Sequence, residues 1–568
     1  MAAVLPAETQ QEPGNPVYRM LWQRRLDHYP DTARRIGYLA VVVAATVVLY
    51  YELYVPGAVA PAIIAQYHMT FPYYVYISVV GNAIGAFSSL VAGLADRWGR
   101  ANLVVYGLAI TALLVLFGLP NASSKLMFAV LFVIVGFVEG IILVATPALV
   151  RDFSPQLGRA SAMGFWTLGP VVGSLVLSEV SSHTLGSMPA WQDQFTICGI
   201  VGLVVFVIAL FTLRELSPNL RDQLMVSMRD RALVEAKAAG IDTRQARANP
   251  WRQMMRVNIV GSAFAISVFL IIYYTAVGFF TIYFTTIFGF TLAQANGIGN
   301  WFWAFNAGAL IVAGVVSDRL RVRKPFMVFG AVGAIVMTIV FLSRTSHPHT
   351  SYYTFVWIIS TLAVFMAIAY APWMAGFTED VEKRNPALTA TGLAVWGWVI
   401  RAVVAVSIFI LPFVVTSMTP LVQSGTQVQT LAAKYSTQLA TIGAIDPATL
   451  GTLSTNPTDL AAGAKAVGEI AGAFHVDAAT ATQRLLAAAA VPSADLTFLR
   501  THAAEVQSAS LSAPGQWHSW WWVCVGGEGV FIPLIFLMGG RWSPRRARTD
   551  LDEHERRVAM EMEALAKS

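Results

Sequence analysis

Four ionisable side chains interrupt long apolar stretches of this sequence: Glu52, Glu139, Arg401 and Glu528. Near the centre of a membrane helix each costs about 2.5 to 3.5 kcal/mol, so we expect each to have a partner or a function. A carboxyl group in apolar surroundings can exchange a proton near neutral pH. A guanidinium group favours a carboxylate or a phosphate. These residue types therefore predict proton transfer and anion binding.

Glu52 is the first proton-coupling candidate. It follows Tyr51 in a tyrosine-rich part of its apolar stretch. The alternative is a solvated or hydrogen-bonded glutamate at the outer end of the span. Glu139 is the second proton-coupling candidate, and its alternative role is that of a partner for Arg401.

Arg401 lies near the middle of an otherwise apolar stretch. Two interpretations stay open: Arg401 binds an anionic substrate, or it forms a permanent ion pair with Glu528 or Glu139. For Glu528 we favour a structural ion pair. Binding pockets combine aromatic walls with a few polar groups. On this basis the predicted substrate contacts are Arg401, Tyr51, Tyr274 and Asn306.

Twelve apolar stretches of membrane-spanning length must position these residues. Of 568 residues, 56% are hydrophobic and 12% are charged. Backbone polar groups in lipid must be satisfied within helices, so we predict an all-α membrane protein. The first six predicted spans are Ile36 to Ala65, Pro72 to Leu94, Leu103 to Leu119, Leu126 to Val150, Ala160 to Val180 and Phe195 to Leu213. The second six are Val257 to Phe288, Asn300 to Val316, Phe326 to Leu342, Tyr353 to Gly376, Leu388 to Val415 and Trp517 to Met538.

The two sets of six spans repeat each other. Three residue pairs have nearly equal separations, of 223, 221 and 228 positions: Tyr50 and Tyr273, Gly93 and Gly314, and Gly169 and Gly397. This pattern predicts two pseudo-symmetric six-helix bundles. Parallel repeats of this kind are one way in which transporters build a site at the middle of the membrane.

The basic residues indicate an orientation, because they gather in alternate joints between spans. We expect no removable signal peptide, a multi-pass protein of the cell membrane, and cytoplasmic termini. Helix-start signals at Asp446-Pro447, Asn456-Pro457 and Pro492-Ser493 predict a helical insertion on the outer face. The predicted parts are a cytoplasmic tail (1–35), a first bundle (36–213), a cytoplasmic loop (214–256), helices seven to eleven (257–415), the extracytoplasmic insertion (416–516), helix twelve (517–538) and a cytoplasmic tail (539–568).

The joint after the second span reads Gly93-Leu94-Ala95-Asp96-Arg97-Trp98-Gly99-Arg100. It resembles the signature loop of the major facilitator superfamily (MFS), and Gly314 to Lys324 is similar to the second copy of that loop. The resemblance implies the MFS fold, in which Asp96 latches the halves in the outward-open state. It also implies that the helix of Glu52 lines the central cavity, so that Glu52 would face that cavity. The implied latch residues are Gly93, Asp96, Arg97, Gly99, Arg100, Gly314, Asp318 and Arg319. The alternative is that these charges only fix topology.

Three departures from the family pattern limit what can be transferred. Ala101 stands where the family often has a base, and Arg321 stands where it prefers glycine. In the fourth span Gly136 and Glu139 replace the arginine and glutamine of a family motif, so the role of that arginine cannot be transferred. Gly169-Pro170 partly resembles a motif of the drug antiporters of the superfamily.

Together, the resemblance and the buried charges predict a monomeric secondary transporter without a cofactor. We expect proton-coupled uptake of a small polar metabolite or organic anion by alternating access. Two alternatives stay open: proton-driven efflux of drugs or amphiphiles, and a membrane sensor or scaffold. The sequence has no nucleotide-binding loop, metal cluster or nucleophile constellation, which argues against an ATP-driven pump or an enzyme. Topology explains the basic joints, so we expect a lipid bilayer and no nucleic acid as partner.

Overall fold

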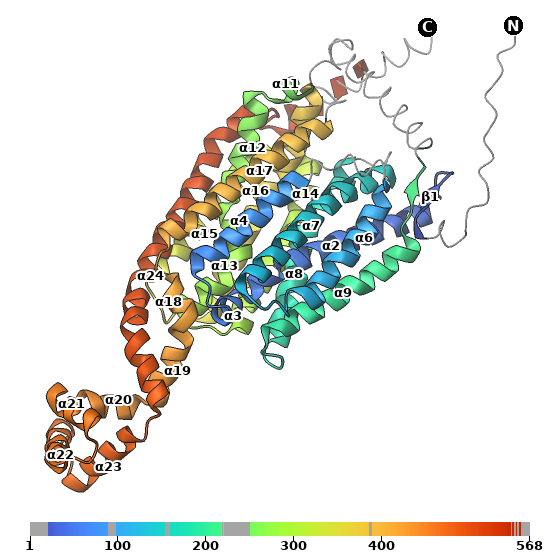
Figure 1. Ribbon diagram of the computed structural model, residues 1–568. Helices are drawn as coiled ribbons and strands as arrows, with labels where there is room; N and C mark the ends of the chain where they lie inside the picture. The colour runs from blue at the N-terminus through green and yellow to red at the C-terminus, as the bar shows by residue number, and fades with distance from the viewer. Residues whose placement is uncertain are drawn as a thin grey trace, which may run out of the picture.

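Long helices that run side by side dominate the computed structural model of the protein (Figure 1). The structure describes residues 21–88, 98–153, 159–217, 220, 250–384 and 389–546, and single or paired residues between 548 and 560. Ten of the described helices are long and apolar enough to cross a membrane. With α4 and α8, which pack among them, they agree with the predicted twelve-helix membrane protein.

In the described part of the chain, the first half of the bundle contains seven helices and one π-helical turn. Their bounds are α2 Thr32–Ala58, α3 Ala60–Gln66, α4 Phe71–Ser88, α6 Arg100–Leu113, η2 Leu114–Gly118, α7 Lys125–Phe153, α8 Arg159–Thr184 and α9 Trp191–Thr212. The first predicted span is in fact two helices, because the chain leaves helical geometry at Val59. Pro61 has no N–H to donate to the carbonyl of Gly57. That carbonyl instead accepts a hydrogen bond from Thr281 Oγ1 in the second half, at 2.6 Å.

The second half repeats this plan. Its helices are α11 Pro250–Met254, α12 Val257–Phe269, α13 Ile271–Phe288, α14 Leu292–Leu320, α15 Lys324–Ser343, α16 Tyr352–Arg384, α17 Thr389–Val414 and α24 Ser493–Leu534, which ends in the 3-10 turn η6 Ile535–Leu537. A capping box starts α14: the Thr291 hydroxyl accepts from the Gln294 amide, and the Gln294 side chain accepts from the Thr291 amide. The predicted twelfth span covers the last part of α24 and then η6, and α24 begins 24 residues before Trp517.

Short helices connect α17 to α24 at one end of the bundle (Figure 1). They are α18 Met418–Pro420, η5 Leu421–Gly425, α19 Thr426–Lys434, α20 Ser436–Gly443, α21 Pro447–Thr455, α22 Leu460–Phe474 and α23 Ala478–Ala489. The first two, α18 and η5, pack against the bundle, whereas α20 to α23 form a separate lobe. Two of the three helix-start signals lie at helix starts, α21 and α24, whereas Asn456 ends α21 and Asp459 caps α22. We call this end of the molecule the insertion end.

Two short strands lie at the opposite end, which we call the strand end. Strand β1 (Arg25–Leu26) pairs in parallel with β2 (Glu215–Leu216), directly after α9. The buried guanidinium of Arg24 donates to the carbonyls of Ala209 and Leu210 in the last turn of α9. Burial lowers the pKa of Arg24. A cation at a helix C-terminus offsets part of that cost, so this contact fixes the segment before α2 to the end of α9.

Candidate functional site

Five tyrosines from both halves meet in the middle of the bundle, and we call them the tyrosine cluster: Tyr50 and Tyr54 of α2, Tyr273 and Tyr274 of α13, and Tyr370 of α16. The rings of the α2 pair are 5.5 Å apart and those of the α13 pair 5.2 Å apart. Electrostatic interactions link Tyr54 to both α13 tyrosines and Tyr370 to Tyr50 and Tyr274. The halves therefore share one polar, aromatic surface.

Arg401 on α17 belongs to the same surface. Its guanidinium interacts electrostatically with Tyr50 of the first half and Tyr274 of the second. The side chain is only partly buried, and it makes no ion pair or hydrogen bond with any residue that the structure describes. In particular, the predicted ion pairs with Glu528 and Glu139 are not formed. The five N–H donors of Arg401 thus have no acceptor among the described residues.

Two buried carboxyl groups lie close together within the first half. Glu52 on α2 and Glu139 on α7 are each 1% exposed and interact electrostatically with each other. Both also interact with the thiol of Cys198 on α9. None of the four carboxyl oxygens has a hydrogen-bond partner among the residues that the structure describes. Two buried, unpaired carboxylates repel each other, so this pair favours protonation of at least one member.

The two carboxyl groups differ in their position relative to the tyrosine cluster: Glu139 lies next to it, and Glu52 lies farther away. Glu139 interacts electrostatically with Tyr50 and Tyr54, so it lies between the cluster and Glu52. Glu52 itself lies against Gly202 of α9 and near Thr111 of α6, inside the first half. The expectation that Glu52 faces the central cavity is therefore wrong. Tyr50 and Tyr54 share one face of α2, and Glu52 is about 200° around the helix from either.

The other predicted site residues lie at helix contacts. Tyr51 is buried, and its hydroxyl has no hydrogen-bond partner among the described residues. It faces α9, where it interacts electrostatically with Cys198. Asn306 on α14 donates to the carbonyl of Ala363 on α16 at 3.0 Å, which uses its amide to join two helices. Glu528 on α24 is fully buried and accepts a 2.9 Å hydrogen bond from Thr338 of α15. A neutral hydroxyl, rather than a cation, is thus its partner in the part of the chain that the structure describes.

The halves are held together at the insertion end. Asn296 on α14 donates to the carbonyl of Ala58 at 2.9 Å, and Thr281 donates to that of Gly57. The side chain of Asn300 donates to Glu179 of α8. All hydrogen bonds that join two described residues of opposite halves lie at this end, and those to the start of the insertion continue them. The tyrosine cluster is therefore closed from the insertion end.

The first signature loop is only partly described: Gly93, Asp96 and Arg97 lie outside the described residues. Gly99 has φ +89°, and a Cβ there would collide with the Glu215 carboxylate. Glu215 in turn accepts from the backbone N–H of Arg100 at 2.6 Å, at the start of α6. The Arg100 guanidinium binds Asp152 of α7 through both carboxylate oxygens, at 2.7 and 2.9 Å. The loop is thus tied to α7 and to the end of α9.

The second copy of the loop has a matching ion pair. Arg323 binds Glu379 of α16 at 2.7 Å and Asp318 at 2.6 Å. Burial disfavours the charge of Arg323, but Glu379 and Asp318 outweigh it and raise its pKa. Arg319 is exposed and has no ion pair with a described residue, and a Cβ at Gly314 would have no atom within 4 Å.

Sequence reasoning missed several residues of these networks. Arg323, Asp152, Glu379 and Glu215 were absent from the predicted latch. Arg100 and Arg323 are 223 positions apart, and Asp152 and Glu379 are 227 apart, both within the range of 221 to 228 positions that separates the repeated residues. Comparing charged residues over that range would have shown that the members of the two ion pairs correspond. Glu215 carries no such signal, because its role depends on how β2 meets β1.

This arrangement defines the class of protein: a multi-pass helical membrane transporter whose two halves meet at a polar centre. Residues 42–409 match the model of the Major Facilitator Superfamily. The chain belongs to this superfamily, and both the predicted family and the predicted fold are confirmed.

Two kinds of relatives add detail. A segment of 156 residues, 27% of this chain, is 31% identical to the multidrug resistance protein MdtL of Shewanella sp. (strain ANA-3) and spans 36% of that protein. The match thus spans about a third of the curated relative. The crystal structure of a bacterial homologue of the human lysosomal transporter Spinster, inward-facing and occupied, has a TM-score of 0.51 and 16% identity, and covers 85% of this chain and 98% of its own. Its inward-facing, unoccupied form has a TM-score of 0.51 and 17% identity, covering 86% and 99%. At these identities the likeness shows the fold alone.

Proposed function

We propose that this transporter couples the uptake of a small organic anion or polar metabolite to protons by alternating access. The observation that carries the proposal is the position of Arg401, whose guanidinium lies beside tyrosines from both halves and has no ion pair with a described residue. A fork of N–H donors in partly apolar surroundings binds carboxylates or phosphates through two parallel hydrogen bonds. A solute held there contacts both halves, so its affinity depends on how the two halves are placed relative to each other.

The carboxyl pair supplies the proton site of this proposal. Glu139 lies next to the tyrosine cluster, where it takes up and releases the coupling proton, and Glu52 is its buried partner in the first half. Because the two carboxyl groups cannot both ionise easily, a proton that enters from the centre is retained by the pair. A substrate anion that binds beside Tyr50 changes the electrostatic potential at Glu139. Substrate binding is thereby coupled to the protonation of Glu139.

Closure at the insertion end supports an access route from the strand end. With the insertion on the outer face of the cell membrane and both termini in the cytoplasm, this conformation faces inward. The signature loops and their ion pairs, Arg100 with Asp152 and Arg323 with Glu379, then lie on the cytoplasmic side. On that side the ion pairs hold the loops in position, and the loops latch the opposite, outward-open state of the monomer.

Efflux of drugs or other amphiphiles is the second candidate function. The partial match to a multidrug resistance protein favours it, as do the aromatic walls of the centre. Under this alternative Arg401 repels cations and the carboxyl pair binds them, so cationic amphiphiles are the expected cargo.

The experiment is transport in proteoliposomes with a panel of organic anions, neutral metabolites and cationic drugs, under pH gradients of both directions. We expect one class of organic anion to accumulate on the side that the proton gradient favours. Proton-driven extrusion of cationic drugs without anion transport would replace the first function by the second. Transport that ignores the pH gradient would contradict both.

A further inference from the structure

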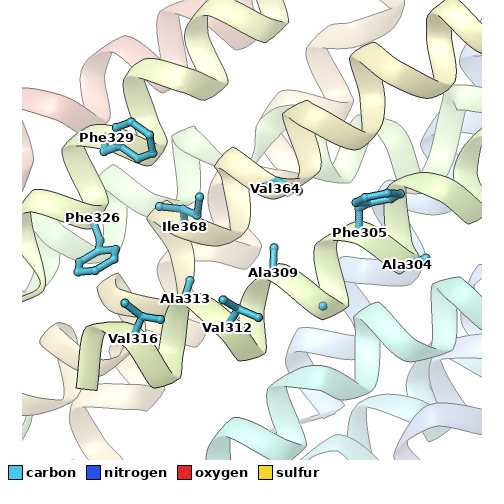
Figure 2. A pocket seen from close by; sticks show the side chains of 11 residues that line it. Ala304, Phe305, Ala309, Val312, Ala313, Val316, Phe326, Phe329, Val364 and Ile368 are labelled. Atoms are coloured by element: carbon cyan, nitrogen blue, oxygen red, sulfur yellow. The ribbon is translucent and has the colours of Figure 1, made fainter. Parts of the chain in front are cut away.

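A groove on the outer surface of the second half is lined entirely by apolar side chains. It has a volume of about 580 Å³ and lies between α14, α15 and α16. Figure 2 shows Phe326 and Val316 at one end and Phe305 and Ala304 at the other. Val312 and Phe329 are each 62% exposed. Because these helices cross the membrane, the groove opens into the hydrocarbon of the bilayer.

The length of the groove matches a lipid chain. Its α14 residues run from Ala304 to Val316, which is about 18 Å along a helix. One leaflet of the hydrocarbon core is about 15 Å thick. Lining residues recur every third or fourth position on α14, so they form one continuous stripe along the helix. An extended acyl chain is therefore the occupant that fits the shape and the chemistry.

The end of the groove near Val316 meets a group of bases. Arg319 continues the same stripe one turn further along α14, and Arg321 caps the helix. Residues 318–324 contain four bases and one acid. Arg323 is neutralised by Asp318 and Glu379, whereas Arg319 and Arg321 are exposed and have no ion pair with any described residue. Two positive charges are thus available at the level where lipid headgroups lie.

We propose that this groove and its two arginines bind one anionic phospholipid. The acyl chain fills the groove, and the phosphate contacts Arg319 and Arg321. The bound lipid lies beside Arg323, whose ion pairs connect α14 to α16. The site is separate from the tyrosine cluster, so the proposal does not depend on the transported solute.

Binding is tested on the full-length protein in detergent, titrated with fluorescent phosphatidylglycerol and with phosphatidylcholine that carries the same chains and label. We expect the wild type to bind phosphatidylglycerol roughly tenfold or more tightly, because two basic residues face its charge. The double variant Arg319→Gln/Arg321→Gln should lose this preference and bind both lipids equally. Arg256→Gln is the matched control, an exposed base at the start of α12, and should keep the preference.

A second pair of variants tests the groove itself. A side chain at Gly308 would enter open space in the groove, so Gly308→Leu should fold normally and weaken the binding of both lipids. Gly526→Leu places the same side chain on an exposed, open position of α24 and should change nothing. Equal binding of the two lipids by the wild type would overturn the proposal. So would wild-type binding in Gly308→Leu, or a dimer that this variant dissociates, which would make a second copy the occupant.

Discussion

At the scale of single residues, Arg401 and the carboxyl pair place opposite charges on the two halves of the molecule. Arg401 comes from α17 in the second half, and Glu52 and Glu139 come from α2 and α7 in the first. The tyrosine cluster separates them. In a low-dielectric setting a charge without a partner raises the free energy of the protein. A solute or proton that neutralises such a charge removes most of this unfavourable free energy.

The first prediction concerns the guanidinium. Arg401→Ala should weaken binding of an anionic substrate about tenfold to a hundredfold, because a hydrogen bond to a charged group contributes about 1.5 to 3 kcal/mol. Arg401→Lys keeps the charge but loses the planar fork, so it should recover only part of the affinity. The measurement is the concentration dependence of counterflow in proteoliposomes. Unchanged affinity in Arg401→Ala would remove this residue from the binding site.

Part of this centre could be predicted from sequence, and part could not. Ionisable residues in apolar stretches are visible directly, which is how Glu139 and Arg401 were found. The direction in which Glu52 points could also be predicted from the sequence, because Tyr50 and Tyr54 share a helix face and Glu52 lies on the opposite face. The hydrogen bond from Asn306 to the Ala363 carbonyl could not be predicted from the sequence, because it depends on the distance between α14 and α16.

At the scale of elements, glycines set how closely α2 and α8 approach. A Cβ at Gly169 would lie 2.6 Å from Thr46 Cγ2, and one at Gly173 would lie 2.7 Å from Tyr50 Cβ. The Thr46 hydroxyl donates to the Val42 carbonyl at 2.8 Å, so its side chain has little freedom to move. Small residues at helix contacts allow this close packing in membranes.

The second prediction compares two glycines that the internal repeat makes equivalent. Gly169→Ala should destabilise the protein by about 1 to 3 kcal/mol, because it overpacks a buried contact. At Gly397 a Cβ would have no atom within 4 Å, so Gly397→Ala should be neutral or stabilise the helix. Thermal unfolding in detergent measures both. The packing argument fails if the two variants shift the midpoint alike.

The insertion offers a pH-dependent helix start. Asp477 caps α23, and its carboxylate accepts from the Thr480 amide at 2.7 Å, a hydrogen bond that lowers the pKa of Asp477. A lowered folded-state pKa means that this stabilisation is present above the ordinary Asp range and is lost as the pH falls toward the lowered value.

The third prediction follows from that sign. Amide protection of α23, corrected for the intrinsic rate of exchange, should fall on acidification through the Asp range in the wild type. Asp477→Ala should show reduced protection at neutral pH and no further loss, whereas Asp477→Asn should keep the cap without the pH dependence. Hydrogen exchange of the full chain, read on peptides from 475–490, measures this. A wild type that stays equally protected in acid would contradict the assignment.

Helix boundaries were the least predictable part of the fold. The predicted start of the last span at Trp517 follows where apolar composition begins, yet α24 continues back to Ser493 through residues that are polar but helix-compatible. The break at Val59 was signalled by Pro61, but its stabilisation needs Thr281 from the other half. Composition shows where lipid begins. It does not show where a helix begins.

At the scale of the whole molecule, the protein is a two-halved transporter that is closed at the insertion end. Its cross-half hydrogen bonds, among described residues, gather around Gly57, Ala58 and Glu179. The Arg100 and Arg323 ion pairs each lie within one half. The halves can therefore separate at the strand end while each stays intact, which is the motion that alternating access requires.

Proton coupling is the central claim, and pH-driven accumulation compared with counterflow in the same proteoliposomes tests it most directly. Counterflow needs only substrate exchange, whereas accumulation needs the proton. Glu139→Gln and Glu52→Gln should abolish accumulation and retain counterflow. Glu528→Gln, a buried carboxyl variant in the other half that can still accept from Thr338, should retain both. Wild-type accumulation in Glu139→Gln and Glu52→Gln would contradict the account.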